Sequence, residues 1–206
     1  MELFEPAACT VDLARGVLDG AGGRYEKRLS DLAGLYEDEA AFAALLAVED
    51  PVVYEVTDFR PSAHAGDLVF GMTRMAPGRV GREFFLTRGH LHARADRPEI
   101  YHGQSGRGLM LLESPAGETR TLSIGPGTIA YVPPFWIHRS VNLGDDHLVM
   151  VFCYPADAGQ DYDVIARSGG MRHRVVAEGA GWALADNRGY RPRPPEAVAA
   201  LLATAA

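Results

Sequence analysis

The hydrophobic positions of the chain follow two patterns, one before residue 51 and one after it. Within residues 25–48, apolar residues recur at steps of three and four, with Glu and Asp between them, which is the spacing of an amphipathic helix. Pro51 closes this segment. From Val52 onward, short apolar runs alternate with Gly and Pro, and such runs predict strands. The clearest of them are residues 52–56, 68–72, 108–112, 128–132 and 147–152.

Short strands at nearly regular spacing, with turn residues between them, are typical of a β-sandwich or β-barrel. A chain of 206 residues has the length of one such domain with extensions. Pro195 followed by Ala- and Leu-rich sequence predicts a terminal helix, because proline is tolerated in the first turn. We therefore expect an all-β barrel at residues 51–166, a helical extension at residues 1–50, and a second extension with the terminal helix at residues 167–206.

Composition narrows the partners and the compartment. The net charge of −7 argues against general nucleic-acid binding, which usually needs a basic surface. No apolar run approaches the roughly 18 residues that span a bilayer, and the first residues lack the pattern of a signal peptide. Cys9 and Cys153 are the only cysteines, without CxxC spacing. We expect a cytoplasmic protein with neither nucleic acid nor membrane as a partner.

Three histidines and one glutamate have the spacing of a metal site. His90 and His92 are two residues apart, so on a strand both imidazoles project to one face. Glu99 follows a turn at residues 96–98, and His138 follows the rigid Pro-Pro turn at residues 133–134. This ligand set suits one divalent Fe, Mn, Co, Ni or Zn ion, and the absence of thiolates argues against structural zinc. The remaining histidines are treated as ordinary surface or core residues: His64, His102, His147 and His173.

The surroundings of the histidines are basic although the chain is acidic. Residues 74–97 contain six arginines against two carboxylates, a balance of 6 − 2 = +4. An anionic small molecule would be attracted to such a region. Arg88, directly before Gly89 and His90, is the arginine expected to contact it, whereas the others are expected to be solvated. These six are Arg74, Arg79, Arg82, Arg88, Arg94 and Arg97.

The metal residues resemble the two cupin motifs. The first reads His90-x-His92-x6-Glu99-x6-Gly106, and the second reads Gly127-x5-Pro133-x-Phe135-x2-His138-x3-Asn142, with Phe135 where glycine is usual. Longer stretches, at residues 84–93, 99–101, 131–142 and 154–159, are similar to the cupin-type glucose-6-phosphate isomerases of archaea and bacteria. The similarity covers residues 52–166. It implies a cupin fold, a double-stranded β-helix or jelly-roll barrel, and a homodimer.

The resemblance also implies roles for individual residues. The metal ligands would be His90, His92, Glu99 and His138, with iron as the favoured ion over Mn, Ni, Co or Zn. Tyr101 matches a tyrosine near the substrate. A sugar phosphate would be bound by Tyr54, Thr73, Thr87, Gly89, Tyr154 and the residue at position 160, and Arg88 joins them because of its charge and its place before Gly89. That residue, Gln160, stands where the family usually has a histidine, and an amide forms hydrogen bonds but carries no proton.

The implied activity is the interconversion of glucose 6-phosphate and fructose 6-phosphate, through an enediol or enediolate, in glycolysis and gluconeogenesis. Glu99 is the favoured base and Tyr101 would orient the substrate, although a carboxylate that binds a cation is a weakened base. A hydride shift between C1 and C2 needs no base and stays open. Three alternatives also stay open: a metal-binding sugar-phosphate sensor without turnover, a cupin dioxygenase, and a mannose-phosphate isomerase.

Overall fold

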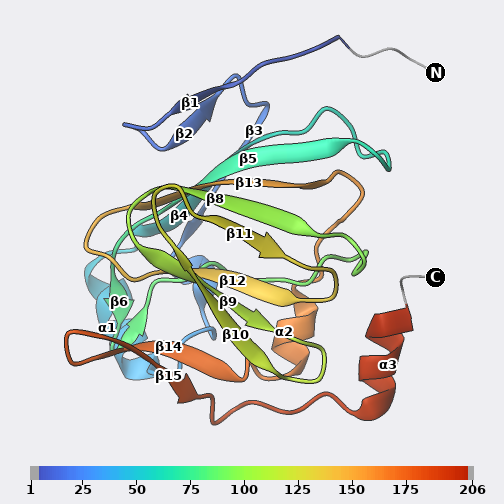
Figure 1. Ribbon diagram of the computed structural model, residues 1–206. Helices are drawn as coiled ribbons and strands as arrows, with labels where there is room; N and C mark the ends of the chain where they lie inside the picture. The colour runs from blue at the N-terminus through green and yellow to red at the C-terminus, as the bar shows by residue number, and fades with distance from the viewer. Residues whose placement is uncertain (1–4, 204–206) are drawn as a thin grey trace.

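Two antiparallel sheets lie one above the other and enclose the main core (Figure 1). The computed structural model describes residues 5–203. The larger sheet has six strands in the order β11–β8–β13–β5–β4–β3, and consecutive neighbours are antiparallel. Their bounds are β11 Ile129–Val132, β8 Glu99–Ser105, β13 Leu148–Pro155, β5 Leu68–Met75, β4 Val52–Phe59 and β3 Gly23–Arg28.

The smaller sheet consists of β10 (Thr119–Ile124), β9 (Gly108–Glu113) and β12 (Ile137–Asn142). The segment at residues 85–91 runs along the free edge of β12. It forms bridges from Leu86 to Val141 and from His90 to His138. This pairing places the first histidine motif beside the second, although 48 residues separate His90 from His138 (138 − 90).

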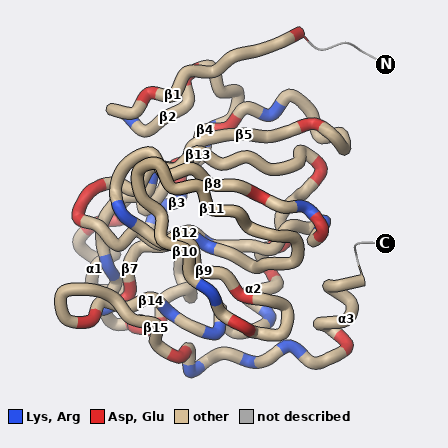
Figure 2. The backbone as a smooth tube through the Cα atoms, in the orientation of Figure 1, with Lys and Arg blue, Asp and Glu red and all other residues tan. Residues whose placement is uncertain are grey.

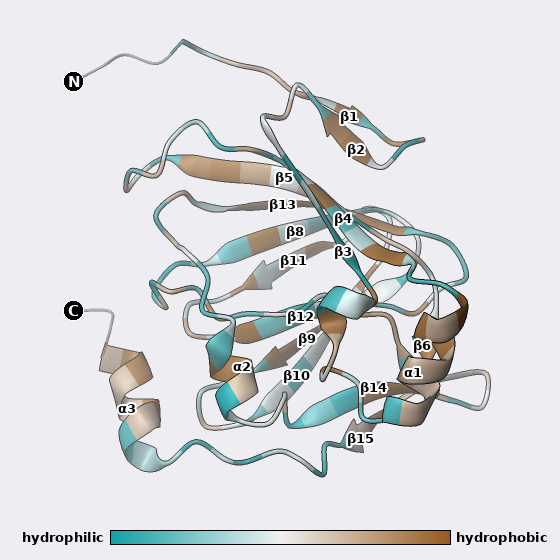
Figure 3. Cartoon of the chain, turned by 180° about the vertical axis from the view of Figure 1, so that it is seen from behind, coloured by the Kyte–Doolittle hydropathy of each residue, from teal (hydrophilic) through white to brown (hydrophobic). Residues whose placement is uncertain are grey.

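Two further sheets cover the outside of this pair. One has the order β15–β14–β7–β6, with bounds β15 Gly181–Asp186, β14 His173–Glu178, β7 Glu83–Phe84 and β6 Arg79–Val80. The other is the hairpin of β1 (Thr10–Asp12) and β2 (Val17–Asp19), where Leu18 packs with Met72 and Val149 of the six-stranded sheet. In the view from behind, hydrophobic stretches are clear along β5 and along the helix α1 (Glu39–Val48) (Figure 3).

The strand predictions are confirmed, and so is the predicted fold class. The five apolar runs lie in β4, β5, β9, β11 and β13, with Thr128 and His147 just outside the strand ends. Most strands of the two stacked sheets carry at most one charged residue (Figure 2). The exceptions are β4, with two, and the edge strand β3, with Arg24, Glu26, Lys27 and Arg28. Within residues 5–203, no helix combines the length and the apolar character needed to cross a membrane.

The single helix predicted for residues 25–48 is wrong over its first half. Tyr25 lies in β3 and pairs with Val56, so cross-strand pairing overrides the local spacing. Leu29, Leu32 and Tyr36 are buried in a short 3-10 segment (η1, Ser30–Leu32) and the turns around it. The α-helix begins only after Asp38, whose side chain accepts a hydrogen bond from Ala41 N at 2.8 Å.

The terminal helix is confirmed as α3 (Pro195–Ala203), and a short helix, α2 (Asp163–Arg167), follows the barrel strands. The domain boundaries at residues 50 and 166 stay predictions. Strand β3 lies before the first boundary and pairs with β4, and β14 lies after the second and pairs with β7. Both outer segments therefore supply strands to the sheets as well as helices.

The two motif glycines offer a matched test of the fold. Gly106 and Gly127 have φ values of 77° and 79°, which cost an alanine about 1 kcal/mol. A Cβ at Gly106 would also lie 2.3 Å from the carbonyl oxygen of His147, whereas no atom lies within 4 Å of a Cβ at Gly127. We expect Gly127→Ala to lower the free energy of unfolding by about 1 kcal/mol and Gly106→Ala by about 3 kcal/mol. Urea denaturation measures both, and equal losses would contradict the clash.

Candidate metal centre

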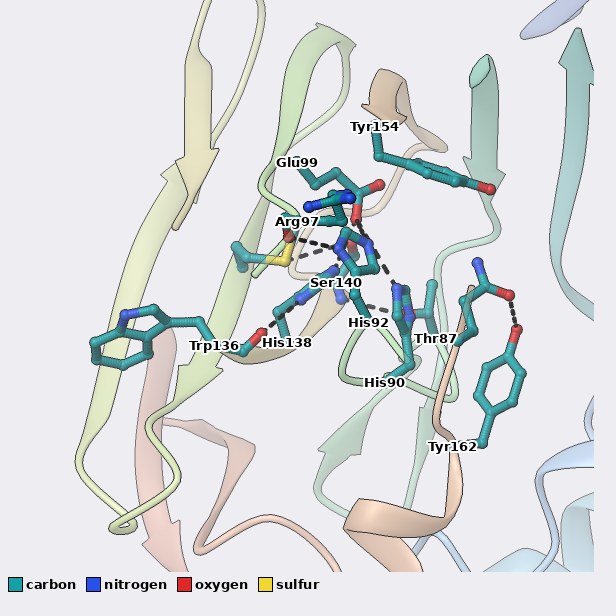
Figure 4. Close-up of polar contacts among 12 residues, drawn as sticks. Thr87, His90, His92, Arg97, Glu99, Trp136, His138, Ser140, Tyr154 and Tyr162 are labelled. Carbon is teal, nitrogen blue, oxygen red and sulfur yellow. Dashed lines mark hydrogen bonds and ion pairs between the residues drawn. The ribbon is translucent and has the colours of Figure 1, made fainter. Parts of the chain in front are cut away.

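Two strands and one segment paired with a strand bring the four predicted ligands to one point. His90 and His92 come from the segment paired with β12, Glu99 is the first residue of β8, and His138 is the second residue of β12. Their ligand atoms all lie within 4.8 Å of one another, and three of the four residues are buried (Figure 4). The cluster therefore joins the two stacked sheets, because Glu99 belongs to the larger and His138 to the smaller.

The carboxylate of Glu99 is the centre of the cluster. Its Oε2 lies 3.0 Å from His138 Nε2, 3.2 Å from His92 Nε2 and 3.9 Å from His90 Nε2. All three imidazoles thus direct the same ring nitrogen toward one oxygen. A convergence of three imidazoles and one carboxylate is the donor set of a divalent transition-metal site.

Backbone carbonyls orient two of the imidazoles. His92 Nδ1 lies 2.7 Å from Arg97 O, and His138 Nδ1 lies 3.1 Å from Trp136 O. If each Nδ1 donates its hydrogen to the carbonyl, the Nε2 lone pair is left for an ion, as is usual in metal sites. In Figure 4 the Trp136 ring points away from the cluster while its carbonyl contacts His138.

Two ring nitrogens of the cluster lack a partner. His90 Nε2 and His92 Nε2 are buried and accept or donate no hydrogen bond. Buried polar atoms are almost always paired, so two unpaired atoms that face one carboxylate need an explanation. A bound divalent cation supplies it, because it would use both lone pairs and neutralise the carboxylate.

Burial and the neighbouring charges set the protonation of the cluster. Burial lowers the pKa of His90 well below its usual value, which keeps this ring neutral and able to bind a cation. Burial raises the pKa of Glu99, but the hydrogen bond from His138 and the close His92 ring outweigh it, so the net pKa is lowered and the carboxylate stays ionised. For His92, burial lowers the pKa, and the carboxylate of Glu99, 3.2 Å away, raises it above the usual value.

The turn before His138 contains a residue with a strained backbone conformation. Phe135 has φ of 70°, and it is the one residue other than glycine with positive φ in the described part of the chain. Its backbone N donates to Ala95 O at 2.6 Å. This bond ties the turn that leads into His138 to the loop that follows His92. Phe135 thus replaces the glycine that is usual in the motif, at a position where the backbone conformation favours glycine.

Ion pairs fix the same loop. The Arg97 guanidinium bonds Asp157 at 3.0 and 2.8 Å and Asp96 at 2.7 Å, and Arg94 lies 3.0 Å from Asp157. Arg97 also supplies the carbonyl that orients His92. Arg94 and Arg97 are therefore paired, and they hold the metal loop. Sequence reasoning gave no such role to Asp157, because nothing local connects it with residues 60 positions earlier.

A cavity of about 630 Å³, part of it open to solvent, adjoins the cluster. Seven lining residues are those predicted to bind substrate: Tyr54, Thr73, Thr87, Arg88, Gly89, Tyr154 and Gln160. His90, Glu99 and Tyr101 line it too, whereas His92 and His138 do not. The structure thus brings the predicted residues together, and their individual roles stay predictions.

Of the six arginines in the basic region, only Arg88 lines this cavity, so the region as a whole does not face it. The second cation is Arg60, which sequence reasoning missed; its Nη2 lies 3.1 Å from Tyr154 OH. Arg88 lies over the ring of Tyr162, 4.4 Å from its centroid, and Tyr162 OH donates to Gln160 Oε1 at 2.5 Å. No motif marks Arg60, because it reaches Tyr154 only across the folded sheet, 94 residues along the chain. Tyr162 lies two residues after Gln160, to which sequence comparison did point.

Comparison with known proteins gives consistent findings. Residues 26–193 match the family described as glucose-6-phosphate isomerase. The chain is 60% identical over 202 residues to "Putative glucose-6-phosphate isomerase 1" of Rhizobium meliloti, covering 97% of this chain and 94% of that one. It is 47% identical over 165 residues to the glucose-6-phosphate isomerase of Pyrococcus furiosus, covering 80% and 87%.

The chain is also similar to solved structures with much lower sequence identity. An oxalate oxidase in complex with glycolate is 16% identical, with a TM-score of 0.46 over 55% of this chain and 57% of that one. A Bacillus subtilis oxalate decarboxylase mutant is 19% identical, with a TM-score of 0.42 over 54% and 28%.

Metal affinity should fall as the pH is lowered. The pKa of His92 is raised in the metal-free cluster, so below that pKa an ion has to displace a proton. We expect the affinity for Mn²⁺ to fall by about tenfold for each pH unit below the pKa, and to level off above it. Calorimetric titration of chelator-treated protein between about pH 5 and pH 8 measures this. His92→Gln should weaken binding and His147→Gln should not, and a pH-independent affinity would refute the proton competition.

Proposed function

The chain belongs to the cupin-type glucose-6-phosphate isomerase family, and from this premise we propose that it interconverts glucose 6-phosphate and fructose 6-phosphate. One observation carries the proposal: part of the metal cluster and the hydroxyl, amide and guanidinium groups suited to a sugar phosphate line a single cavity. Glu99 and His90 represent the cluster there, and Thr87 and Arg88 represent the polar groups.

Residues 87–89 are well suited to hold the phosphate. Thr87 Oγ1 accepts a hydrogen bond from Ser140 N at 3.0 Å, which leaves the hydroxyl hydrogen to donate to a phosphate oxygen. Gly89 has φ of 76°, and a Cβ there would lie 2.9 Å from Arg139 Cβ, so only glycine fits this backbone. Thr73 supplies a second hydroxyl, and Arg88 supplies the positive charge.

A divalent cation at the cluster would stabilise the negative charge that develops on O1 and O2 of the sugar during isomerisation. Tyr101 would contribute a neutral phenol: burial, with the charge and hydrogen bond of Glu99, raises its pKa well above the usual value. Tyr101 therefore donates a hydrogen bond and does not act as a base. The lowered pKa of Glu99 makes it a weak base, so proton and hydride transfer between C1 and C2 both stay open.

Gln160 is the predicted substrate-binding residue that departs from the family pattern. Its Oε1 is occupied by Tyr162 OH, which leaves its NH2 group to donate to a substrate oxygen. This amide can position a sugar but cannot transfer a proton. We propose that Gln160 binds substrate and lacks the acid–base role that a histidine at this position could have.

We further propose that the ion is iron, with Mn, Ni, Co or Zn able to replace it, and that the enzyme works in glycolysis and gluconeogenesis in the cytoplasm. A homodimer is supported by apolar side chains exposed on the outer face of the six-stranded sheet. Ile100 and Tyr131 are neighbours across β8 and β11, and Ile129 lies beside them; they are 42%, 53% and 67% exposed. The net charge of −7 supports the absence of a nucleic-acid partner.

Activity should depend on the metal. Fructose 6-phosphate is supplied to the purified protein, and formation of glucose 6-phosphate is followed with a coupled dehydrogenase. We expect turnover that a chelator abolishes and that Fe²⁺ or Mn²⁺ restores, because no side chain alone stabilises the charge on both sugar oxygens. Mannose 6-phosphate, supplied in parallel, tests the related isomerase. If fructose 6-phosphate binds but no metal supports turnover, the isomerase function is wrong and a sugar-phosphate sensor is favoured.

A Gln160→His variant should be faster than the natural chain. A positioned general acid or base contributes typically 10²–10⁴-fold, so we expect kcat to rise by about tenfold or more with little change in KM. Gln104→His is the matched control, because Gln104 lies in β8 and does not line the cavity. An unchanged or lower kcat in Gln160→His would show that the natural enzyme needs no proton carrier at this position.

A further inference from the structure

Behind the segment at residues 87–89 lies a second cavity with its own cluster of cations. It holds about 1,140 Å³ of space, part of it open to solvent, and it is separate from the cavity beside the metal cluster. Arg88 and Tyr162 line both cavities and so form the wall between them. The lining combines three arginines with apolar side chains such as Leu35, Ile165 and Met171.

Arg139 is the unusual residue of this cavity. It follows His138 on β12, so alternation turns its side chain to the opposite face of the strand from the metal ligand. The residue is only 6% exposed. Nη2 donates to Arg88 O at 2.9 Å, Nε has no partner, and no carboxylate of the described residues forms an ion pair with it. A buried guanidinium without a counter-ion is costly, and natural proteins rarely leave one unpaired.

The other charges around the cavity do not neutralise Arg139. Arg174 bonds Glu83 at 2.8 Å, so that carboxylate is already used, and Arg174 Nε is buried without a partner. Asp31 is the one carboxylate among the described residues that line the cavity, and it accepts a hydrogen bond from Arg28 N. Arg88 also lacks an ion pair with any described carboxylate, since its guanidinium lies on the Tyr162 ring.

We propose that this second cavity binds the phosphate group of a small organic anion. Arg139 and Arg174 each line the cavity and each has an unpaired Nε, and guanidinium groups pair with phosphate through parallel hydrogen bonds. Leu35, Ile165 and Met171 would contact the organic part. The site needs neither the metal nor turnover, and its ligand would touch the far side of Arg88, which lines the substrate cavity.

Phenyl phosphate is the probe, because it combines a phosphate with an apolar ring. Calorimetric titration into the metal-loaded full chain should show two binding events per chain, one in each cavity. Arg139→Gln should weaken one event by about 10- to 100-fold and leave the other, whereas Thr87→Val should weaken only the other. Arg120→Gln, an exposed arginine that lines neither cavity, should change neither event.

A single event that Arg139→Gln leaves unchanged would overturn the proposal. Since loss of a buried residue can also prevent folding, crystals of the unaltered protein soaked in selenate give an independent answer. Anomalous scattering should reveal selenium beside Arg139 in the second cavity, in addition to any ion near Thr87. Selenium near Thr87 alone, or none in either place, would count against the second site even if the isomerase activity is confirmed.

Discussion

The antiparallel pairing of residues 85–91 with β12 is the constraint on which the rest of the site depends. His90 N donates to His138 O at 3.0 Å, and His138 N donates to His90 O at 2.9 Å. These two bonds fix the distance between the two histidine motifs before any ion is considered. The same pairing sets Thr87 against Ser140, so it positions both the predicted metal ligands and the predicted phosphate contacts, with a register shift of one residue between the Leu86–Val141 and His90–His138 bridges.

Local sequence was sufficient where function depends on spacing within one segment. The two-residue step from His90 to His92 and the turn before Glu99 predicted their convergence, and the structure places their ligand atoms within 4.8 Å. The helix predicted from residue 25 is wrong because Tyr25 pairs with Val56 across the sheet and so adopts a strand conformation. The local spacing of apolar residues contains no information about this partner. Arg60 was missed for a similar reason, since only the folded sheet brings it to Tyr154.

Arginine has three different physical roles around the centre, and the local charge balance could not separate them. Arg97 lies against Asp157 and holds the metal loop, Arg88 stacks on an aromatic ring at the cavity wall, and Arg139 is buried without a carboxylate. A count of charges predicts attraction of anions to the whole region. Which of these arginines can bind an anion depends on whether a carboxylate already pairs with it. These ion pairs form only in the folded chain.

The left-handed backbone of Phe135 has a consequence for motion. A glycine would adopt this conformation without strain but would also let the turn sample many others. In Phe135 this conformation costs about 1–2 kcal/mol of conformational free energy. The Phe135 ring packs against the main core, and this contact anchors the peptide that leads into His138. The peptide before a predicted metal ligand is thus held by a side chain. A glycine at position 135 would lead into the same imidazole through a looser turn.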